Sequence, residues 1–468
     1  MKSLTAKDLS LPIDPCCEDI FKIFQNHLSQ RFDKPVFNTF DENELTEKIS
    51  GLLGKKGQGS DKLLQILEDI VINHSMNLQN PMYMGHQVPP TLPVAAMLDL
   101  ITSSMNQSMA VTRMSPVLSI MEEEVIQFLC TKIGYNTNAG GTLTSGGSVS
   151  NLIGLYGARK NFFPKSVPDN AVILCSDQSH YSVAKSAGIL GFSNENVIKI
   201  ESDDNYKIDI DKTIEIIDNL KLNGYKPFVI SANAGSTSTG SFDDIEELSS
   251  IAQTYDMWLH IDAAHGGSLV FSDQLKHLIK GIEHADSISW DAHKMMYIPS
   301  SLGICLFKES NELKNCFKDS NAPYLYNGKE TCKDLSKQSI QCTRRGDSLK
   351  LWGTLLTYGT DFFAERLEHV YDVTQYFYDK LINHQYLEPL NDPEFNIQCF
   401  RYNSGKLSEA ELNEINATIR DEVNNTGELM ITLTCIKNKV CMRVTIINPA
   451  TTYQHIDRLI EIIETCCP

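Results

Sequence analysis

The chain has 468 residues, of which 42% are hydrophobic and 21% are charged, and its 41 basic and 59 acidic residues give a net charge of −18. This length allows a large core divided over two or three subdomains. An acidic surface repels phosphate backbones and anionic lipid, which argues against nucleic-acid or membrane-surface binding as the main function. The sequence has no uninterrupted apolar stretch of about 18 residues, so no membrane-spanning helix is expected. The first twenty residues lack the apolar segment of a signal peptide.

The cysteines indicate a reducing, cytoplasmic environment. There are 13 of them, an odd number, and none stands in C-x-x-C spacing. The adjacent pairs Cys16-Cys17 and Cys466-Cys467 are poorly placed to hold structural zinc. We therefore expect neither a disulfide framework nor a metal site.

The first third of the chain is predicted to be mainly helical. Apolar residues recur at helical spacing in 20–24 and 63–71, which predicts helices within residues 1 to about 80. The segment 80–93 is broken by four prolines and predicts a loop. A long apolar helix is expected from there to about Gly134.

Between about 140 and 310, short apolar runs alternate with helical stretches. Their apolar character is continuous and not alternating, which is typical of a mostly parallel sheet that is covered on both faces. The predicted strands are AVILCS (171–176), PFVISANAG (227–235), MWLHIDAAH (257–265), DSISW (286–290) and GICLF (303–307).

The C-terminal part predicts a small α+β domain. A long helix is expected over 345–367, two strands over 428–436 and 440–448, and a helix over 455–464. The predicted fold class is therefore α/β with a mostly parallel central sheet. We expect three parts: a helical N-terminal segment (1–90), a large domain (91–350) and a small C-terminal domain (351–468).

Three reactive side chains are predicted to lie at strand ends, where ligands gather in α/β sheets. Asp262 ends one strand, His180 follows another, and Lys294 follows a third. A lysine in a partly apolar setting can attack a carbonyl, a carboxylate can keep a pyridine nitrogen protonated, and an imidazole can lie flat on that ring. Each has a structural alternative as a surface lysine, a helix cap or a core histidine. Together they favour a catalytic site.

A glycine-rich turn precedes a helix at 140–160. Gly146 and Gly147 allow close backbone approach, and the helix N-terminus offers free N–H groups to an anion such as a cofactor phosphate. The turn is neither a P-loop nor a G-x-G-x-x-G fingerprint, which argues against ATP and NAD.

These residues carry a resemblance to the group II pyridoxal-phosphate (PLP)-dependent amino-acid decarboxylases, the family of the glutamate, cysteine sulfinate, aromatic and diaminobutyrate enzymes. The resemblance extends from about residue 75 to the C-terminus. The loop at 80–93 and the sequence D-A-H-K-M are most similar to the bacterial diaminobutyrate-type members. The matching motifs are NPMYMGHQ, LTSGGSVSN, SDQSHYSVAKSAGILG, AGSTSTGSFDDI, WLHIDAAHGGS, ADSISWDAHKMM and MRVTIINPATT.

The resemblance implies a fold type I (aspartate aminotransferase-like) enzyme that binds PLP in the large domain. It also implies a homodimer with the active site at the interface, in which residues 1–90 pack on the partner subunit. Lys294 would be the Schiff-base lysine, Asp262 the partner of the pyridinium nitrogen and His180 the histidine stacked on the ring. Further cofactor contacts would be Gly147, Ser148, Thr237, Ala264 and His293.

Three residues are candidates for substrate binding. Arg443 matches an arginine that engages the substrate carboxylate in some members, although a salt bridge within the C-terminal domain is an equal alternative. His86 lies on the loop that lines the pocket of relatives, and His265 takes the place of an aromatic residue found in several of them. Either histidine would contact a polar side chain of the substrate or have only a packing role in the protein.

The chain departs from the family pattern in two places. Many relatives have asparagine where this chain has Asp291, and a carboxylate facing the phosphate would repel it, so we expect Asp291 to turn away or to pair with a donor. Relatives also carry a loop tyrosine that protonates the product carbanion, whereas the matching stretch 327–344 contains none. Thr331 and Cys332 are the nearest candidates by position, and His180 or solvent is the alternative donor.

The expected activity is α-decarboxylation of a small amino acid to the amine and carbon dioxide. Diaminobutyrate, glutamate, aspartate and cysteine sulfinate are all open as substrates, with aromatic amino acids less favoured. The alternatives are another fold type I enzyme (a transaminase, a carbon–carbon lyase or a decarboxylating oxidative deaminase) and a non-catalytic paralogue acting as a binding subunit. Loss of Lys294 or Asp262 would favour the last, and both are present.

Overall fold

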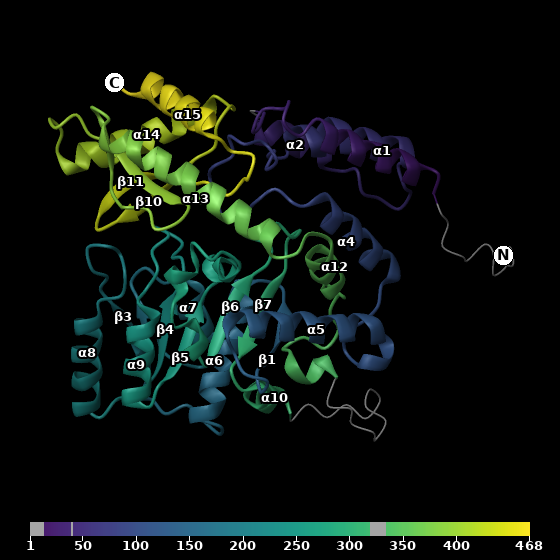
Figure 1. Ribbon diagram of the computed structural model, residues 1–468. Helices are drawn as coiled ribbons and strands as arrows, with labels where there is room; N and C mark the ends of the chain where they lie inside the picture. The colour runs from purple at the N-terminus through teal and green to yellow at the C-terminus, as the bar shows by residue number, and fades with distance from the viewer. Residues whose placement is uncertain (1–13, 39–40, 319–333) are drawn as a thin grey trace, which may run out of the picture.

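The computed structural model describes residues 14–38, 41–318 and 334–468. Two β-sheets organise this part of the chain (Figure 1). The larger sheet and its helices form the lower half of the view, and the smaller sheet lies above it with the C-terminal helices.

The larger sheet has seven strands in the order β1-β7-β6-β5-β4-β2-β3. Only β7 runs antiparallel to its neighbours, so the prediction of a mostly parallel sheet is confirmed. All five predicted strands are present, whereas β1 and β3 were not anticipated. The strands are β1 (Gly140–Thr144), β2 (Ala171–Ser176), β3 (Val197–Ile200), β4 (Lys226–Asn233), β5 (Trp258–Asp262), β6 (Ser287–Asp291) and β7 (Gly303–Phe307).

Both faces of this sheet are covered, which explains the continuous apolar character of its strands. In β2, Val172 and Leu174 join the core cluster that includes α5, α8 and α9, while Ile173 and Cys175 join the cluster that includes α6, α7 and α10. The covering helices are α5 (Pro116–Ile133), α6 (Gly147–Phe162), α7 (Ser182–Ile189), α8 (Ile210–Leu222), α9 (Ile245–Tyr255) and α10 (Ser310–Phe317).

Two predicted long helices are each broken into two. The helix expected up to Gly134 is divided into α4 (Pro93–Met105) and α5, because Asn106 adopts a left-handed conformation (φ 47°) at the end of α4. The helix expected over 345–367 is divided into α12 (Ser348–Tyr358) and α13 (Asp361–Ile382) at Gly359, whose φ is 68°.

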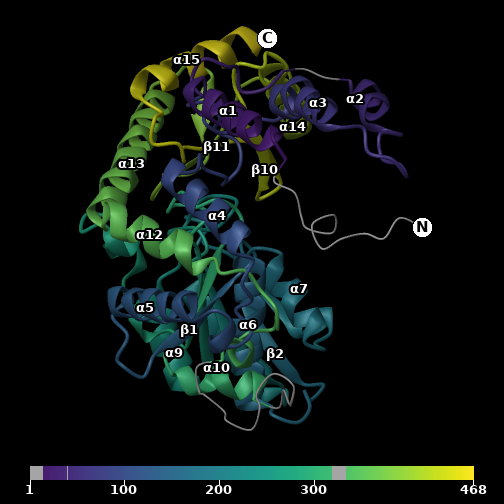
Figure 2. The same ribbon diagram turned by 90° about the vertical axis from the view of Figure 1, so that its right-hand side faces the viewer.

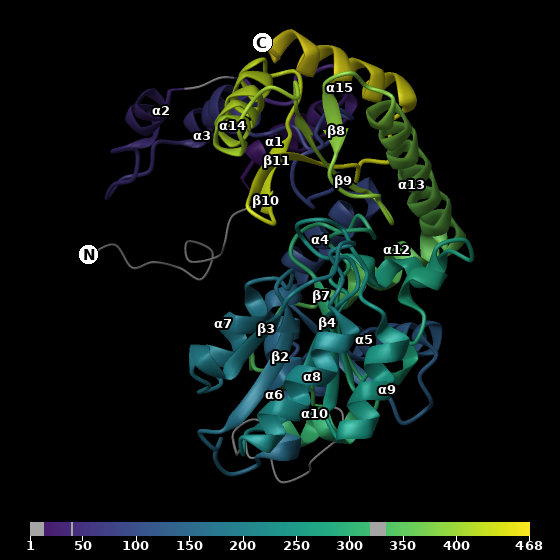
Figure 3. The same ribbon diagram turned by 90° about the vertical axis from the view of Figure 1, so that its left-hand side faces the viewer.

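The smaller sheet is antiparallel, with the order β10-β11-β9-β8, and it is covered by C-terminal helices (Figure 3). The predicted C-terminal strands and helix are confirmed. This unit consists of β8 (Leu387–Pro389), β9 (Ile397–Tyr402), α14 (Glu409–Asn425), β10 (Thr432–Ile436), β11 (Lys439–Thr445) and α15 (Tyr453–Cys466).

The N-terminal segment lies beside the C-terminal unit of its own chain (Figures 1 and 2). It contains α1 (Cys16–Ser29), α2 (Glu42–Ile49) and α3 (Ser60–Ile66), which continues into a π-helical turn over Leu67–Ile72. Backbone hydrogen bonds join Val36 N to Gly427 O (3.1 Å) and Met84 N to Met430 O (3.0 Å). The three-part division, and the packing of 1–90 on a partner, stay predictions. Within the described ranges, no helix combines the length and the apolar character needed to cross a bilayer.

Candidate active site

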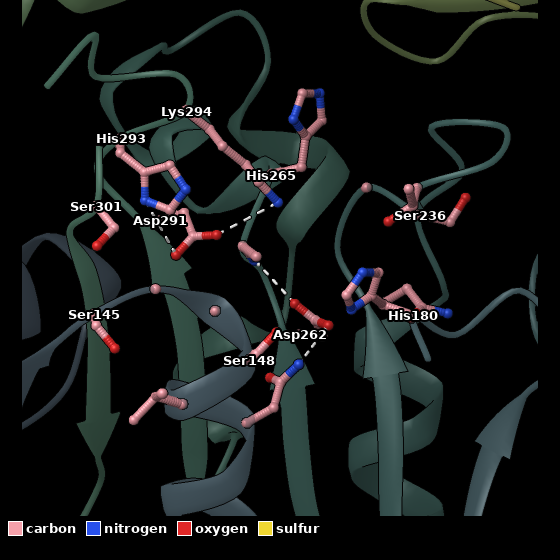
Figure 4. A pocket seen from close by; sticks show the side chains of 18 residues that line it. Ser145, Ser148, His180, Ser236, Asp262, His265, Asp291, His293, Lys294 and Ser301 are labelled. Atoms are coloured by element: carbon pink, nitrogen blue, oxygen red, sulfur yellow. Dashed lines mark hydrogen bonds and ion pairs between the residues drawn. The ribbon is translucent and has the colours of Figure 1, made fainter. Parts of the chain in front are cut away.

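The ends of β2, β4, β5 and β6 lie at the same edge of the large sheet, where the side chains after them surround a cavity of about 300 Å³ (Figure 4). Most of the predicted site residues meet here. Those that line the cavity are Gly147, Ser148, His180, Thr237, Asp262, Ala264, His265, His293 and Lys294. His86 and Arg443 do not line it.

The glycine-rich turn forms one wall of the cavity. Gly146 has a φ of 132°, and α6 begins at Gly147. A Cβ atom on Gly147 would lie 2.9 Å from Asp291 Oδ2 and 3.1 Å from the Ala264 Cβ, so no side chain fits there. The first N–H groups of α6 have no acceptor within the helix and are available to an anion. This geometry fits a cofactor phosphate.

Asp262 ends β5 and is 8% exposed. Its Oδ2 accepts a hydrogen bond from Asn151 Nδ2 (2.8 Å), and its Oδ1 accepts one from the backbone N–H of Ala264 (3.1 Å). Within the described ranges it has no ion-pair partner. A buried carboxylate without a cation is suited to hold a protonated ring nitrogen. Asn151 escaped the sequence analysis, although it ends the quoted motif LTSGGSVSN.

Lys294 follows β6 and its Nζ lies 3.4 Å from Asp291 Oδ2 (Figure 4). Asp291 therefore does not turn away from the glycine-rich turn. Instead it pairs with a donor, which was the second expectation. Its other oxygen, Oδ1, is buried without a hydrogen-bond partner and lies 3.7 Å from His293 Nδ1. The Lys294 amine is thus held by a neighbour on the same turn, and both residues line the cavity.

His180 lies in the loop between β2 and α7. Its Nδ1 accepts a hydrogen bond from the backbone N–H of Ser182 (3.3 Å) and lies 2.8 Å from Ser182 Oγ, which places the ring proton on Nε2. Burial lowers the pKa of His180, and the charge of Lys294 lowers it further against the opposing effect of Asp262. The ring is therefore neutral near pH 7. A neutral imidazole is a weak acid, which argues against His180 as the replacement proton donor.

His265 connects the cavity to the C-terminal unit. Its Nε2 lies 2.7 Å from Asn396 Oδ1, while its Nδ1 is buried without a hydrogen-bond partner. Burial lowers the pKa of His265 to about 3, and the charge of Lys294 adds to the effect. His265 therefore offers a neutral acceptor nitrogen beside the cavity.

Arg443 on β11 is a buried cation, and none of the described residues gives it a carboxylate partner. Its guanidinium Nη1 lies 3.4 Å from Thr432 Oγ1, and its Nε has no hydrogen-bond partner. No acidic side chain of the described residues lies within ion-pair distance, so the alternative of a structural salt bridge is not supported. Burial lowers the pKa of Arg443, and its charge lowers the pKa of both His86 and His265. The charge of Arg443 therefore acts on both histidines.

The stretch expected to carry the proton donor is only partly described. Thr331 and Cys332 lie outside the described residues. In the described part, Asp334 Oδ1 accepts a hydrogen bond from Thr112 N (3.0 Å) and Arg344 pairs with Glu122. None of residues 334–344 lines the cavity.

Comparisons with known proteins identify the class. Residues 51–403 match the family described as the pyridoxal-dependent decarboxylase conserved domain. A crystal structure of mouse CSAD is 26% identical, covers 97% of this chain and 99% of its own, and superposes with a TM-score of 0.91. The protein is therefore a fold type I enzyme that uses PLP.

The chain belongs to the pyridoxal-dependent decarboxylase family, and its relatives are amino-acid carboxy-lyases. L-2,4-Diaminobutyrate decarboxylase of Acinetobacter baumannii is 29% identical over 439 residues, covering 89% of this chain and 86% of its own. Acidic amino acid decarboxylase GADL1 of Mus musculus is 28% identical over 428 residues, covering 87% and 77%. The resemblance to group II decarboxylases is confirmed, while the named substrates of the relatives differ.

Proposed function

We propose that this enzyme removes the α-carboxylate of a small acidic amino acid (aspartate, glutamate or cysteine sulfinate), with Lys294, Asp262 and His180 as its catalytic residues. One observation carries the proposal: these three side chains, from three separate segments of the chain, meet in one cavity beside an anion-binding turn. Their convergence at the carboxyl edge of the sheet is typical of a ligand site in α/β folds.

The roles follow from the surroundings of each residue. Bound PLP supplies the sink for the electrons of the broken carbon–carboxylate bond. Lys294 would hold the cofactor covalently through its amine. Asp262 would keep a proton on the ring nitrogen, and the neutral ring of His180 would pack against the cofactor. The turn at Gly147 would bind the phosphate, and the remaining contacts would come from Ser148, Thr237, Ala264 and His293.

The preference for an acidic substrate is supported by Arg443. A buried guanidinium without a carboxylate among the described residues is favourable only when an anion pairs with it. His265 and His86 both have lowered pKa values, so neither adds a charge near neutral pH. A substrate that brought a second cation would be repelled by Arg443. These charges favour carboxylate or sulfinate side chains over the ammonium of diaminobutyrate.

Diaminobutyrate is the second candidate, because the A. baumannii diaminobutyrate decarboxylase is similar over most of both chains. A panel of aspartate, glutamate, cysteine sulfinate, diaminobutyrate and an aromatic amino acid tests both, with carbon dioxide and amine measured for each. We expect the acidic compounds to be the best substrates. Exclusive turnover of diaminobutyrate would refute the substrate class. Keto-acid products, or no reaction at all, would refute the decarboxylase and favour a transaminase or a binding subunit.

We also propose a homodimer, in which residues 1–90 contact the partner subunit. The support is a set of exposed large apolar side chains on α1, on α3 with the π-helical turn that follows it, on α4 and on α5. A partner surface would cover them. Light scattering should give twice the chain mass, and a monomeric active enzyme would contradict the proposal. The exposed residues are Ile20, Phe21, Leu63, Val71, Leu100, Ile101, Val117 and Ile120.

A cytoplasmic location is proposed from the cysteines. Every described cysteine is free, which is typical of proteins kept in a reducing compartment.

A further inference from the structure

A line of buried hydrogen bonds runs from the interior of the large sheet to Asp262. Trp258 Nε1 donates to Ser287 Oγ (2.9 Å), and this oxygen lies 2.8 Å from His260 Nδ1. His260 Nε2 lies 3.0 Å from Asn151 Oδ1, and Asn151 Nδ2 donates to Asp262 Oδ2 (2.8 Å). We call these five side chains the Trp258–Asp262 relay.

The two ends of the relay set its direction. The indole N–H can only donate, and a carboxylate can only accept. Ser287 Oγ accepts a hydrogen bond from the indole N–H, so its own hydroxyl group donates to His260 Nδ1. His260 then carries its single proton on Nε2 and donates a hydrogen bond to Asn151 Oδ1. Both N–H groups of the Asn151 amide therefore point to the opposite side, where Asp262 lies. Burial lowers the pKa of His260 well below its ordinary value, in agreement with a neutral ring. Every link therefore points towards Asp262.

Asn151 also branches the relay to His180. Its amide donates a second hydrogen bond to Ser182 Oγ (2.9 Å), and Ser182 Oγ lies 2.8 Å from His180 Nδ1. Because Ser182 Oγ accepts a hydrogen bond from the amide, its hydroxyl group is available to donate a hydrogen bond to the imidazole. One amide group thus contacts Asp262 directly and orients His180 through one serine.

The inner part of the relay is closely packed, whereas Asn151 and Asp262 also line the cavity. Asn151, His260, Ser287 and Trp258 are all buried. A Cβ atom on Gly154, one turn after Asn151 on α6, would lie 2.5 Å from His260 Cε1. In a dry interior, an unmatched donor or acceptor keeps its full desolvation penalty.

We propose that Asn151 is a positioning residue that orients Asp262 and His180 together, and that the Trp258–Asp262 relay holds its amide in the required direction. The inference rests on the proposed roles of Asp262 and His180. In Asn151→Asp, the shape is kept but an acceptor oxygen replaces the amide donor that faces Asp262. Two carboxylates cannot share that contact unless one takes a proton or turns away.

The test compares Asn151→Asp with Asn416→Asp in the full-length enzyme. Asn416 is also buried, and its amide bonds to the backbone of Tyr402 and Leu412 in the C-terminal unit, neither of which belongs to the relay. The readouts are the Kd for PLP and the pH titration of the visible absorption of the lysine-bound cofactor. We expect Asn151→Asp to raise the Kd at least about tenfold and to shift the titration midpoint, and Asn416→Asp to change neither. Wild-type values for Asn151→Asp would overturn the proposal.

A second pair decides the question if Asn151→Asp does not fold. Trp258→Phe removes the donor at the start of the relay, while Trp290→Phe removes an equally buried indole that donates to Ser268 Oγ (3.0 Å) outside it. Only Trp258→Phe should shift the titration midpoint, and equal midpoints in the two variants would overturn the proposal. Asp262→Asn serves as a reference: if it binds PLP as tightly as the wild type, the proposed role of Asp262 itself is wrong.

Discussion

Arg443 and Arg401 form a natural comparison between a ligand-binding and a structural arginine. They lie on the adjacent strands β11 and β9 and are 6% and 5% exposed, respectively. Arg401 pairs with Glu388 (2.5 Å) and Glu409 (2.6 Å), whereas Arg443 has no carboxylate partner among the described residues. Substitution of each arginine by methionine removes the charge and keeps much of the volume.

The two variants should differ in stability. Replacing an unpaired buried cation by an apolar side chain removes a desolvation penalty, so Arg443→Met should leave the Tm unchanged or raise it by a few degrees. Arg401→Met leaves two carboxylates without their partner. Both are partly exposed, so we expect a loss of about 1–3 kcal/mol and a lower Tm.

The two variants should differ in the opposite sense in activity. If Arg443 binds the substrate carboxylate, its loss removes a buried charge pair of about 2–4 kcal/mol, which corresponds to a decrease in kcat/KM of roughly 30- to 1000-fold. Arg401→Met should stay within about threefold of the wild type. Carbon dioxide release and thermal denaturation measure the two effects. A destabilised Arg443→Met variant with wild-type kcat/KM would show that Arg443 is structural.

Three further predictions concern the site and its protonation. Borohydride should bleach the visible absorption and modify Lys294, and peptide mapping that finds another modified lysine would contradict its assignment. Burial lowers the pKa of His265 to about 3 in the folded protein, whereas its ordinary value is about 6.5. Below pH 6.5 the unfolded chain therefore binds a proton that the folded protein does not, and the free energy of unfolding falls by ~2 kcal/mol between pH 7 and pH 5. The fall in Tm over this range should be smaller in His265→Gln than in the wild type or in the exposed-site variant His277→Gln, and equal falls would refute the assignment of a low pKa to His265. The stretch 327–344 has no tyrosine, so protonation of the product carbanion should be slow. Oxygen should then divert some turnover to aldehyde, ammonia and hydrogen peroxide. Equal yields of amine and carbon dioxide without oxygen uptake would show that another proton donor acts.

The sequence by itself was enough to predict the central sheet and the gathering of Lys294, Asp262 and His180 at one edge of it. Strands buried on both faces are recognisable because nearly every position along them is apolar, as in 171–176 and 303–307. Asp262 ends such a strand and Lys294 and His180 follow two others, and parallel strands bring their carboxyl ends to one edge. The glycines at 146 and 147 were identifiable for a similar reason, since a close backbone approach demands their lack of a side chain.

Only the tertiary structure decided which side chains pair. Asn151 and Asp262 are 111 residues apart, and no local pattern in the sequence indicates that their side chains form a hydrogen bond. Whether Arg443 had a carboxylate partner depended on which side chains the folded C-terminal unit places around it. The breaks at Asn106 and Gly359 interrupt apolar patterns that remain helical on both sides, because a single left-handed residue redirects the backbone without changing the periodicity. Long-range contacts depend on the packing of whole elements, and local patterns do not encode that packing.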